Sequence, residues 1–148
     1  MSVKIAIGSD HAGYELKEKV KARLQKAGHE VSDLGADSDE STDYPVYGHR
    51  VGHSVAGGEA EMGVVVCGSG IGVCMAANKV PGVRAALAWN DENARLARAH
   101  NDANVLCLGG RTMDHDEALA TLDVWLETPF DGGRHERRVE MIEDVDCR

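Results

Sequence analysis

Short apolar runs alternate along this chain with longer segments in which apolar and polar residues recur at helical spacing. The apolar runs predict five strands, at 3–8, 29–34, 62–66, 84–88 and 104–108. The intervening and following segments predict helices, at 14–27, 44–56, 72–80, 91–100, 114–126 and 134–145. In the first helix, Tyr14, Leu16, Val20 and Leu24 are expected to form the apolar side.

Regular alternation of strand and helix with short links is typical of βαβ units and a parallel sheet. The fold class expected is α/β, a three-layer αβα sandwich with a doubly wound, Rossmann-like, five-stranded parallel sheet and a C-terminal helix. Residues 1–148 are expected to form a single domain.

Right-handed crossovers leave ligands at the carboxyl ends of the strands. The turns after the first, third and fifth strands therefore meet at one edge, and they carry Asp10 with His11, Cys67 with the glycines that follow it, and Arg111. His100 and Asn101 precede the fifth strand, so strand direction alone predicts that they lie at the opposite edge.

Three glycines in five positions, Gly68, Gly70 and Gly72, stand between a buried strand and a helix start, with Ser69 and Ile71 between them. Glycine lets the backbone approach a ligand, and the first N–H groups of a helix attract anions. We interpret the turn as an anion or oxyanion site; the alternative is a tight turn that needs glycine for packing alone. It is not a dinucleotide fingerprint, because Val73 stands where a third glycine is required.

Cys67 lies at the start of this turn, where a helix N-terminus stabilises a thiolate that can act as a base or a nucleophile. The alternative is a buried structural thiol, which is the commoner state of a cysteine after an apolar run. Cys74 and Cys107 are expected in the core, and Cys147 in the C-terminal tail.

Two further groups have both a structural and a functional interpretation. Asp10 and His11 either cap the first helix or hold a ligand. Arg134 and Arg138 share a helix face and either pair with neighbouring glutamates or clamp a phosphate, for which the arginine fork is well suited.

No metal site is expected. His49 and His53 are four residues apart on a predicted helix, but no glutamate accompanies them as in a metalloprotease motif, and a solvated helix face is the better interpretation.

The formal net charge of −9 argues against nucleic acid as a partner, since duplex binding needs an excess of Lys and Arg. No apolar run approaches membrane-spanning length, and the N-terminal residues show no signal-peptide pattern. Four cysteines without a disulfide framework favour a reducing compartment, so a cytoplasmic protein is expected.

The chain resembles the ribose-5-phosphate isomerase B family, within a wider group that includes the galactose-6-phosphate isomerase subunits. The matching segments span nearly the whole chain, at 8–13, 42–45, 67–72, 76–79, 100–102, 104–106, 132–135 and 138–139. The resemblance implies a homodimer, or a dimer of dimers, without metal or organic cofactor. One branch of the family uses a cysteine as base, and another has glycine there and a glutamate after the loop; Cys67 and Val73 place this chain with the cysteine type.

The implied reaction interconverts D-ribose 5-phosphate and D-ribulose 5-phosphate through a cis-enediolate, in the pentose phosphate pathway. The catalytic residues implied are Cys67 as base, His100 for ring opening and Ser69 in support of the thiolate. The implied substrate-binding residues are Asp10, His11, Tyr44, Gly68, Ser69, Gly70, Ile71, Gly72, Asn101, Arg111, Arg134 and Arg138.

The family places His100 in the active site, whereas strand direction places it at the far edge. A symmetric dimer would reconcile the two, with Cys67, Asp10 and the glycine turn from one chain and His100, Asn101 and Arg111 from its partner. The alternative is a loop that carries His100 round within one chain.

Other functions stay open at this point. The same chemistry suits allose 6-phosphate, galactose 6-phosphate or a tetrulose phosphate. A non-catalytic sugar-phosphate-binding module is a second possibility. A thiol-redox enzyme is a third, which the lack of a resolving cysteine near Cys67 disfavours.

Overall fold

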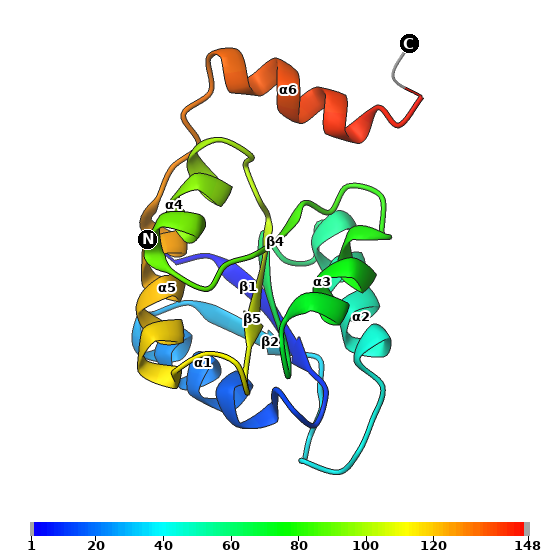
Figure 1. Cartoon of the computed structure of the whole chain (residues 1–148), viewed down its shortest axis with the longest axis vertical. Coiled ribbons are helices and arrows are strands. Elements are labelled where there is room, and N and C mark those ends of the chain that lie inside the picture. The colour runs from blue at the N-terminus through cyan, green and yellow to red at the C-terminus, as the bar shows by residue number, and fades with distance from the viewer. Residues whose placement is uncertain (1, 147–148) are drawn as a thin grey trace.

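The computed structural model describes residues 2–146, and its strands lie side by side in one parallel sheet of order β2-β1-β3-β5-β4 (Figure 1). The strands are β1 (Lys4–Ser9), β2 (Glu30–Asp33), β3 (Met62–Cys67), β4 (Ala85–Leu87) and β5 (Val105–Gly109). The helices are α1 (Tyr14–Lys26), α2 (Tyr44–Ala56), α3 (Ile71–Asn78), α4 (Asp91–Ala99), α5 (His115–Glu127) and α6 (Arg134–Glu143). The predicted α/β class and order of elements are confirmed.

The largest difference from the predicted bounds is at α3, which was expected at 72–80. Gly70 adopts a left-handed conformation at φ 78° and starts the helix one residue earlier. At the other end, the Asn78 side chain pairs with the backbone N–H and C=O of Ala85, at 2.8 and 2.9 Å, so the end of the helix is fastened to β4. Cys147, predicted in the tail, lies outside the described residues.

Helices cover both faces of the sheet (Figure 1). On one face, α1, α4 and α5 pack aliphatic and alanine side chains around Trp125 against alternate residues of the central strands. On the other face, α2 and α3 enclose a second core that includes Val65, Cys107 and Cys67. Burial on both faces explains why the central strands are apolar throughout rather than alternating.

The buried face of α1 differs from the one expected. Leu16, Val20 and Leu24 are buried as predicted, but Tyr14 is only partly covered, and Lys17 is 1% exposed. The ammonium group of Lys17 donates to both carboxylate oxygens of Asp33, each at 2.9 Å. Such a pair cannot be read from hydrophobic periodicity, because a lone Lys in an amphipathic helix is normally solvated.

Helix α6 lies at the amino ends of the strands and projects from the body (Figure 1), anchored by buried Val139 and by an ion pair of 2.7 Å between Arg84 and Glu143. Its residues Met141 and Ile142 are exposed. Among the described residues, no helix combines the length and apolar character needed to cross a membrane.

Candidate active site

The strand order reverses between β1 and β3, since the chain moves outward from β1 to β2 and then returns to the other side of β1. Helix α1 leaves β1 on one face and α3 leaves β3 on the other, so the turns after these strands separate and leave a crevice. Asp10 lies next to Cys67 across this point, because the Asp10 N–H donates to the carbonyl of Val66 at 3.3 Å.

The turn after β5 joins the same edge. The Gly110 N–H donates to the carbonyl of Cys67 at 2.8 Å, and the Arg111 N–H donates to the carbonyl of Gly68 at 2.9 Å. Arg111 is therefore held beside the glycine turn of its own chain. The expectation that Arg111 comes from a partner subunit was wrong, because β5 pairs directly with β3 and brings its turn alongside.

These turns enclose a cavity of about 510 Å³. It brings together most of the predicted site residues of the carboxyl edge and adds two that were not predicted. The lining residues are Asp10, His11, Ala12, Tyr44, Cys67, Gly68, Ser69, Ile71, Gly72, Met75 and Arg111. Gly70 lies buried at the base of the turn.

The Cys67 sulfur is approached by a backbone donor. The Gly70 N–H lies 3.2 Å from Sγ, in position to stabilise a thiolate. The Ser69 hydroxyl accepts from the Ile71 N–H at 3.1 Å, which leaves its own proton free to donate. The amide N–H groups of Gly68, Ser69 and Gly72 have no acceptor within the described part of the chain. The turn thus presents free donors at the positive end of α3.

Packing explains two of the three glycines. A Cβ on Gly70 would lie 2.6 Å from the Leu87 side chain and 2.9 Å from the Leu108 backbone, and a Cβ on Gly72 would lie 2.5 Å from the Tyr44 ring. At Gly68 a Cβ would meet only ordinary contacts, at 3.5 Å and beyond. The packing interpretation therefore applies to Gly70 and Gly72, and the Tyr44 ring that packs on Gly72 also forms a wall of the cavity.

Asp10 is buried, and one carboxylate oxygen accepts from the Gly13 N–H at 3.0 Å. Gly13, not Ser9 or Asp10, is the N-cap of α1, so Asp10 shapes the turn rather than capping the helix. His11 lies at the rim of the cavity and is shared with a larger neighbouring cavity of about 760 Å³.

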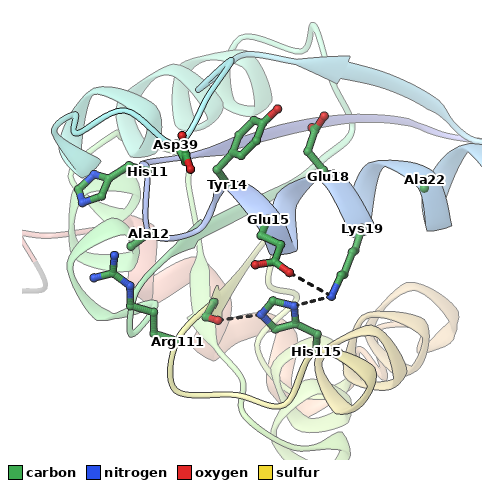
Figure 2. A pocket seen from close by; sticks show the side chains of 11 residues that line it. His11, Ala12, Tyr14, Glu15, Glu18, Lys19, Ala22, Asp39, Arg111 and His115 are labelled. Atoms are coloured by element: carbon green, nitrogen blue, oxygen red, sulfur yellow. Dashed lines mark hydrogen bonds and ion pairs between the residues drawn. The ribbon is translucent and has the colours of Figure 1, made fainter.

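Figure 2 shows this larger cavity between α1 and the start of α5, with the His11 imidazole and the Arg111 guanidinium on the same side of its rim. His115, which showed no signal in the sequence, supports the wall. Its Nε2–H donates to the carbonyl of Gly110 at 2.8 Å, while Lys19 Nζ donates to Nδ1 at 2.9 Å. This bridge fixes the turn that carries Arg111.

The remaining predicted residues lie at the amino edge, as strand direction predicted for His100 and Asn101. His100 caps the C-terminus of α4, and its ring stacks on His135 with centroids 4.2 Å apart. Arg134 and Arg138 are exposed on α6 beside this stack. None of these residues lines the Cys67 cavity of the same chain.

Within the described residues, one group has metal-ligand spacing: ligand atoms of His100, Asp131 and His135 lie within 4.8 Å of one another. The two rings are inclined by only 12°, so their in-plane lone pairs run parallel and do not converge on one ion. Burial first, and then the neighbouring His100 and Arg134, lower the pKa of His135. The positive charges of Arg134 and Arg138 beside the stack favour an anion over a cation there.

A search of protein families matches residues 5–142 to the ribose/galactose isomerases. The chain belongs to this isomerase family. Ribose-5-phosphate isomerase B of Escherichia coli is 45% identical over 98% of this chain and 97% of its own length.

Solved structures of family members share the fold of this isomerase. The isomerase B of Clostridium thermocellum superimposes with a TM-score of 0.95, at 50% identity and 97% coverage of both chains. The Mycoplasma genitalium enzyme, solved with bound ribulose 5-phosphate, gives a TM-score of 0.93 at 41% identity, covering 97% of this chain and 95% of its own.

Sequence reasoning missed several residues around this isomerase's cavities. Ala12 and Met75 carry no chemical signal, and only the backbone course of the turns brings them to the cavity wall. Asp131 and His135 could have been noticed, since both neighbour the predicted Arg134 in sequence. The stack on His100 depends on the backbone N–H of Asp131, which donates to the carbonyl of Ala99 at 3.0 Å.

Proposed function

We propose that this chain is an aldose–ketose isomerase that interconverts D-ribose 5-phosphate and D-ribulose 5-phosphate with Cys67 as its base. The observation that best supports this proposal is the environment of the Cys67 sulfur. The sulfur accepts a backbone N–H and lies beside free amide donors, in a cavity at the point where the strand order of the sheet reverses. The names of the relatives and the ribulose 5-phosphate bound to one of them support the substrate.

The Cys67 thiolate removes the C2 proton of the open-chain aldose, negative charge passes from sulfur to O1, and a cis-enediolate forms. The proton of the O2 hydroxyl passes to O1, the Cys67 thiol returns its proton to C1, and the carbonyl forms at C2, giving the ketose and the thiolate again. The sulfur is buried beside Val66 and Gly70, so little solvent competes with the substrate for it. Positioned general bases contribute about 10²- to 10⁴-fold to such steps.

The free N–H groups of Gly68, Ser69 and Gly72 stabilise the charge that develops on oxygen. One donor of this kind contributes about 3–4 kcal/mol to the transition state. Since the turn is fixed by the hydrogen bonds of Gly110 and Arg111 to Cys67 and Gly68, the donors need no reorganisation during the reaction.

The complete site is shared between two copies of the chain. Cys67, Asp10, His11, Tyr44 and Arg111 come from one subunit, and His100, Asn101, Arg134 and Arg138 of the partner subunit close the cavity. An imidazole can both accept and donate a proton, so His100 of the partner subunit is suited to open the sugar ring. The arginine forks bind the phosphate away from the reacting carbons and orient the substrate.

This assignment implies a homodimer, or a dimer of dimers, in which residues 1–148 act as one domain. It also implies a cytoplasmic enzyme of pentose phosphate metabolism, because its substrate is a charged intracellular sugar ester. No resident metal or organic cofactor has a place in the scheme.

The test is a panel of sugar phosphates assayed for kcat/KM: ribose 5-phosphate, allose 6-phosphate, galactose 6-phosphate and a tetrulose phosphate. The highest kcat/KM is expected for ribose 5-phosphate. A preference for a hexose phosphate would keep the mechanism and overturn the substrate. Binding of all four without turnover would instead identify a sugar-phosphate-binding module.

A further inference from the structure

The His11 side chain is held from behind by the loop that precedes α2. Its Nδ1 atom lies 3.1 Å from the backbone nitrogen of Thr42 and 3.2 Å from the carbonyl oxygen of the same residue. His11 and Thr42 are 31 residues apart, so this contact is made by the fold and not by the local turn. Nε2, the other ring nitrogen, has no partner among the described residues, and the ring lines both cavities.

This geometry favours one position for the proton. When the Nδ1 atom of the neutral ring accepts from the Thr42 N–H, the proton is on Nε2. A neutral ring with its proton on Nδ1 would donate to the Thr42 carbonyl, but its N–H would then face the Thr42 N–H across 3.1 Å. When the ring is charged, Nδ1–H donates to the Thr42 carbonyl, and Nε2 again carries a proton. In the favoured neutral form and in the charged form, His11 offers an N–H donor to the cavity, on the side where Figure 2 shows the Arg111 guanidinium.

Thr42 is in turn fixed by a buried tyrosine. Its Oγ1 lies 3.1 Å from the hydroxyl of Tyr47, which is 9% exposed on α2. The Tyr47 ring packs under Gly35, where a Cβ would approach to 2.9 Å, and the Arg50 guanidinium lies over it at 5.2 Å. The segment between Gly35 and Thr42 is exposed at 37–41, so this anchor holds the end of an otherwise solvated loop.

We infer that Thr42 and Tyr47 are positioning residues that keep His11 in its Nε2–H form, aimed at the phosphate of the substrate. The inference rests on the proposed function, in which His11 binds that phosphate. The Tyr47 hydroxyl contacts Thr42, and Thr42 contacts His11, so Tyr47 affects phosphate binding without touching the substrate. The mechanism above assigns no role to this buried hydroxyl, and the inference supplies one.

The test combines Tyr47→Phe, which keeps the packed ring, with Thr42→Val, which keeps the shape of the side chain. Each variant is expected to raise KM for ribose 5-phosphate about 3- to 10-fold, with kcat within about 2-fold of wild type, because one neutral hydrogen bond is lost from the anchor. The double variant is expected to be no worse than either single variant. Thr42→Ser should restore KM, since it keeps Oγ1.

A spectroscopic measurement separates positioning from a general structural effect. In ¹⁵N spectra, the two ring nitrogens of His11 should be well separated in the wild type, as the Nε2–H tautomer requires, and should move toward each other in Tyr47→Phe and Thr42→Val. A His11→Asn spectrum assigns the signals. Thr121→Val, which removes a buried α5 hydroxyl that contacts Asp91 and lines neither cavity, is the control and should change neither signal nor KM.

Titration with inorganic phosphate tests the inference independently of the isomerase reaction. Phosphate should shift the His11 Nε2 signal, with a Kd about 3- to 10-fold weaker in Tyr47→Phe. If the wild type fails to isomerise ribose 5-phosphate, the proposed function fails while this titration still decides the role of Tyr47. Unchanged tautomer signals and phosphate affinity in both variants would overturn the inference.

Discussion

The two edges of the sheet carry different halves of the proposed chemistry. At the carboxyl edge, the Cys67 sulfur and Asp10 are buried, and three turns are hydrogen-bonded into a fixed cavity. At the amino edge, His100 and His135 stack beside exposed Arg134 and Arg138 on the projecting helix α6. The first half is preorganised within one chain, whereas the second presents imidazole and guanidinium groups outward.

This contrast supports the proposal that the site is shared between two chains. The carboxyl edge supplies a base and oxyanion donors, and the cationic or imidazole side chains that it adds to the lining of the Cys67 cavity are His11 and Arg111. The amino edge holds a second set of such groups at the far end of the strands. In the proposed dimer, a two-fold axis would bring one edge of each subunit to the other edge of its partner and so make two complete sites.

The largest expected effect is at the carboxyl edge. Cys67→Ala should lower kcat by about 10³-fold or more, since it removes the base, while substrate affinity stays nearly intact. Steady-state kinetics with ribose 5-phosphate and a direct binding measurement check both statements. Cys74→Ala, which removes a partly buried thiol from α3, is the matched control and should keep near-wild-type kcat.

Alkylation gives an independent measure of the same thiol. Iodoacetamide should inactivate the wild-type enzyme with label on Cys67, and ribose 5-phosphate should protect it. Substantial activity in Cys67→Ala would show that another group is the base.

Mixing two inactive variants tests the division of the site between the edges. Cys67→Ala and His100→Ala, unfolded and refolded together in equal amounts, should recover about a quarter of wild-type activity. Random pairing makes half of the dimers mixed, and each mixed dimer holds one intact site of two. Each variant refolded alone is the control. A mixture that stays inactive would show that Cys67 and His100 act within one chain.

A smaller effect is expected at the amino edge. Arg138→Ala should raise KM for ribose 5-phosphate about 10- to 100-fold, because a charge-assisted contact to phosphate is lost, and should change the poor turnover of free ribose little. Arg137→Ala removes a neighbouring exposed arginine that contacts Met141 on its own helix, and it should leave both substrates nearly unaffected. Equal losses on the two substrates with Arg138→Ala would assign that arginine a structural role.

The two edges also differ in how far the sequence predicted them. Cys67, Asp10 and the glycines were expected together because parallel strands bring the turns after them to one edge, and the lining of the cavity agrees. The same rule placed His100 at the far edge. The rule also placed the turn of Arg111 at the carboxyl edge, but it could not show that this turn lies directly beside that of Cys67. That follows from the pairing of β3 with β5, and strand order is not a local property.

Contacts that depend on where side chains point could not be predicted from the sequence. Buried Lys17 interrupts the apolar face of α1, and only the position of Asp33 at the end of the neighbouring β2 makes its burial possible. Tyr44 against Gly72 and Thr42 against His11 likewise join segments about 30 residues apart. Periodicity reports which face of an element is apolar, but not which polar partners meet across the fold.

The last prediction concerns the stability of the carboxyl edge. Asp33 is the last residue of β2, and its carboxylate accepts hydrogen bonds from the Lys17 ammonium group and from the Gly35 N–H. It therefore stabilises the start of the loop that leads to Thr42. Asp33→Asn should lower the free energy of unfolding by about 3 kcal/mol at neutral pH, because buried Lys17 then keeps only the partly exposed Glu18 carboxylate, at 3.3 Å, as its ionic partner. Asp123→Asn breaks an exposed pair with Arg23 and should cost less than about 1 kcal/mol.

The dependence of this effect on pH follows from the direction of the Asp33 pKa. Burial alone would raise it, but the hydrogen bonds from Lys17, Gly35 and Lys21 outweigh burial and hold the pKa below its ordinary value of 3.8. A lowered carboxyl pKa contributes stability that is fully present above the ordinary value and is lost as pH falls through the folded-state value. Denaturant unfolding should therefore show a difference between wild type and Asp33→Asn that is larger at pH 6 than at about pH 3, with the loss beginning only as pH approaches the ordinary value of 3.8. Hydrogen exchange should show the Gly35 amide losing protection in acid before amides of β5 do, since the opening begins at the edge that Asp33 fastens. A difference that stays constant over this pH range would show that Asp33 acts through shape and not through its charge.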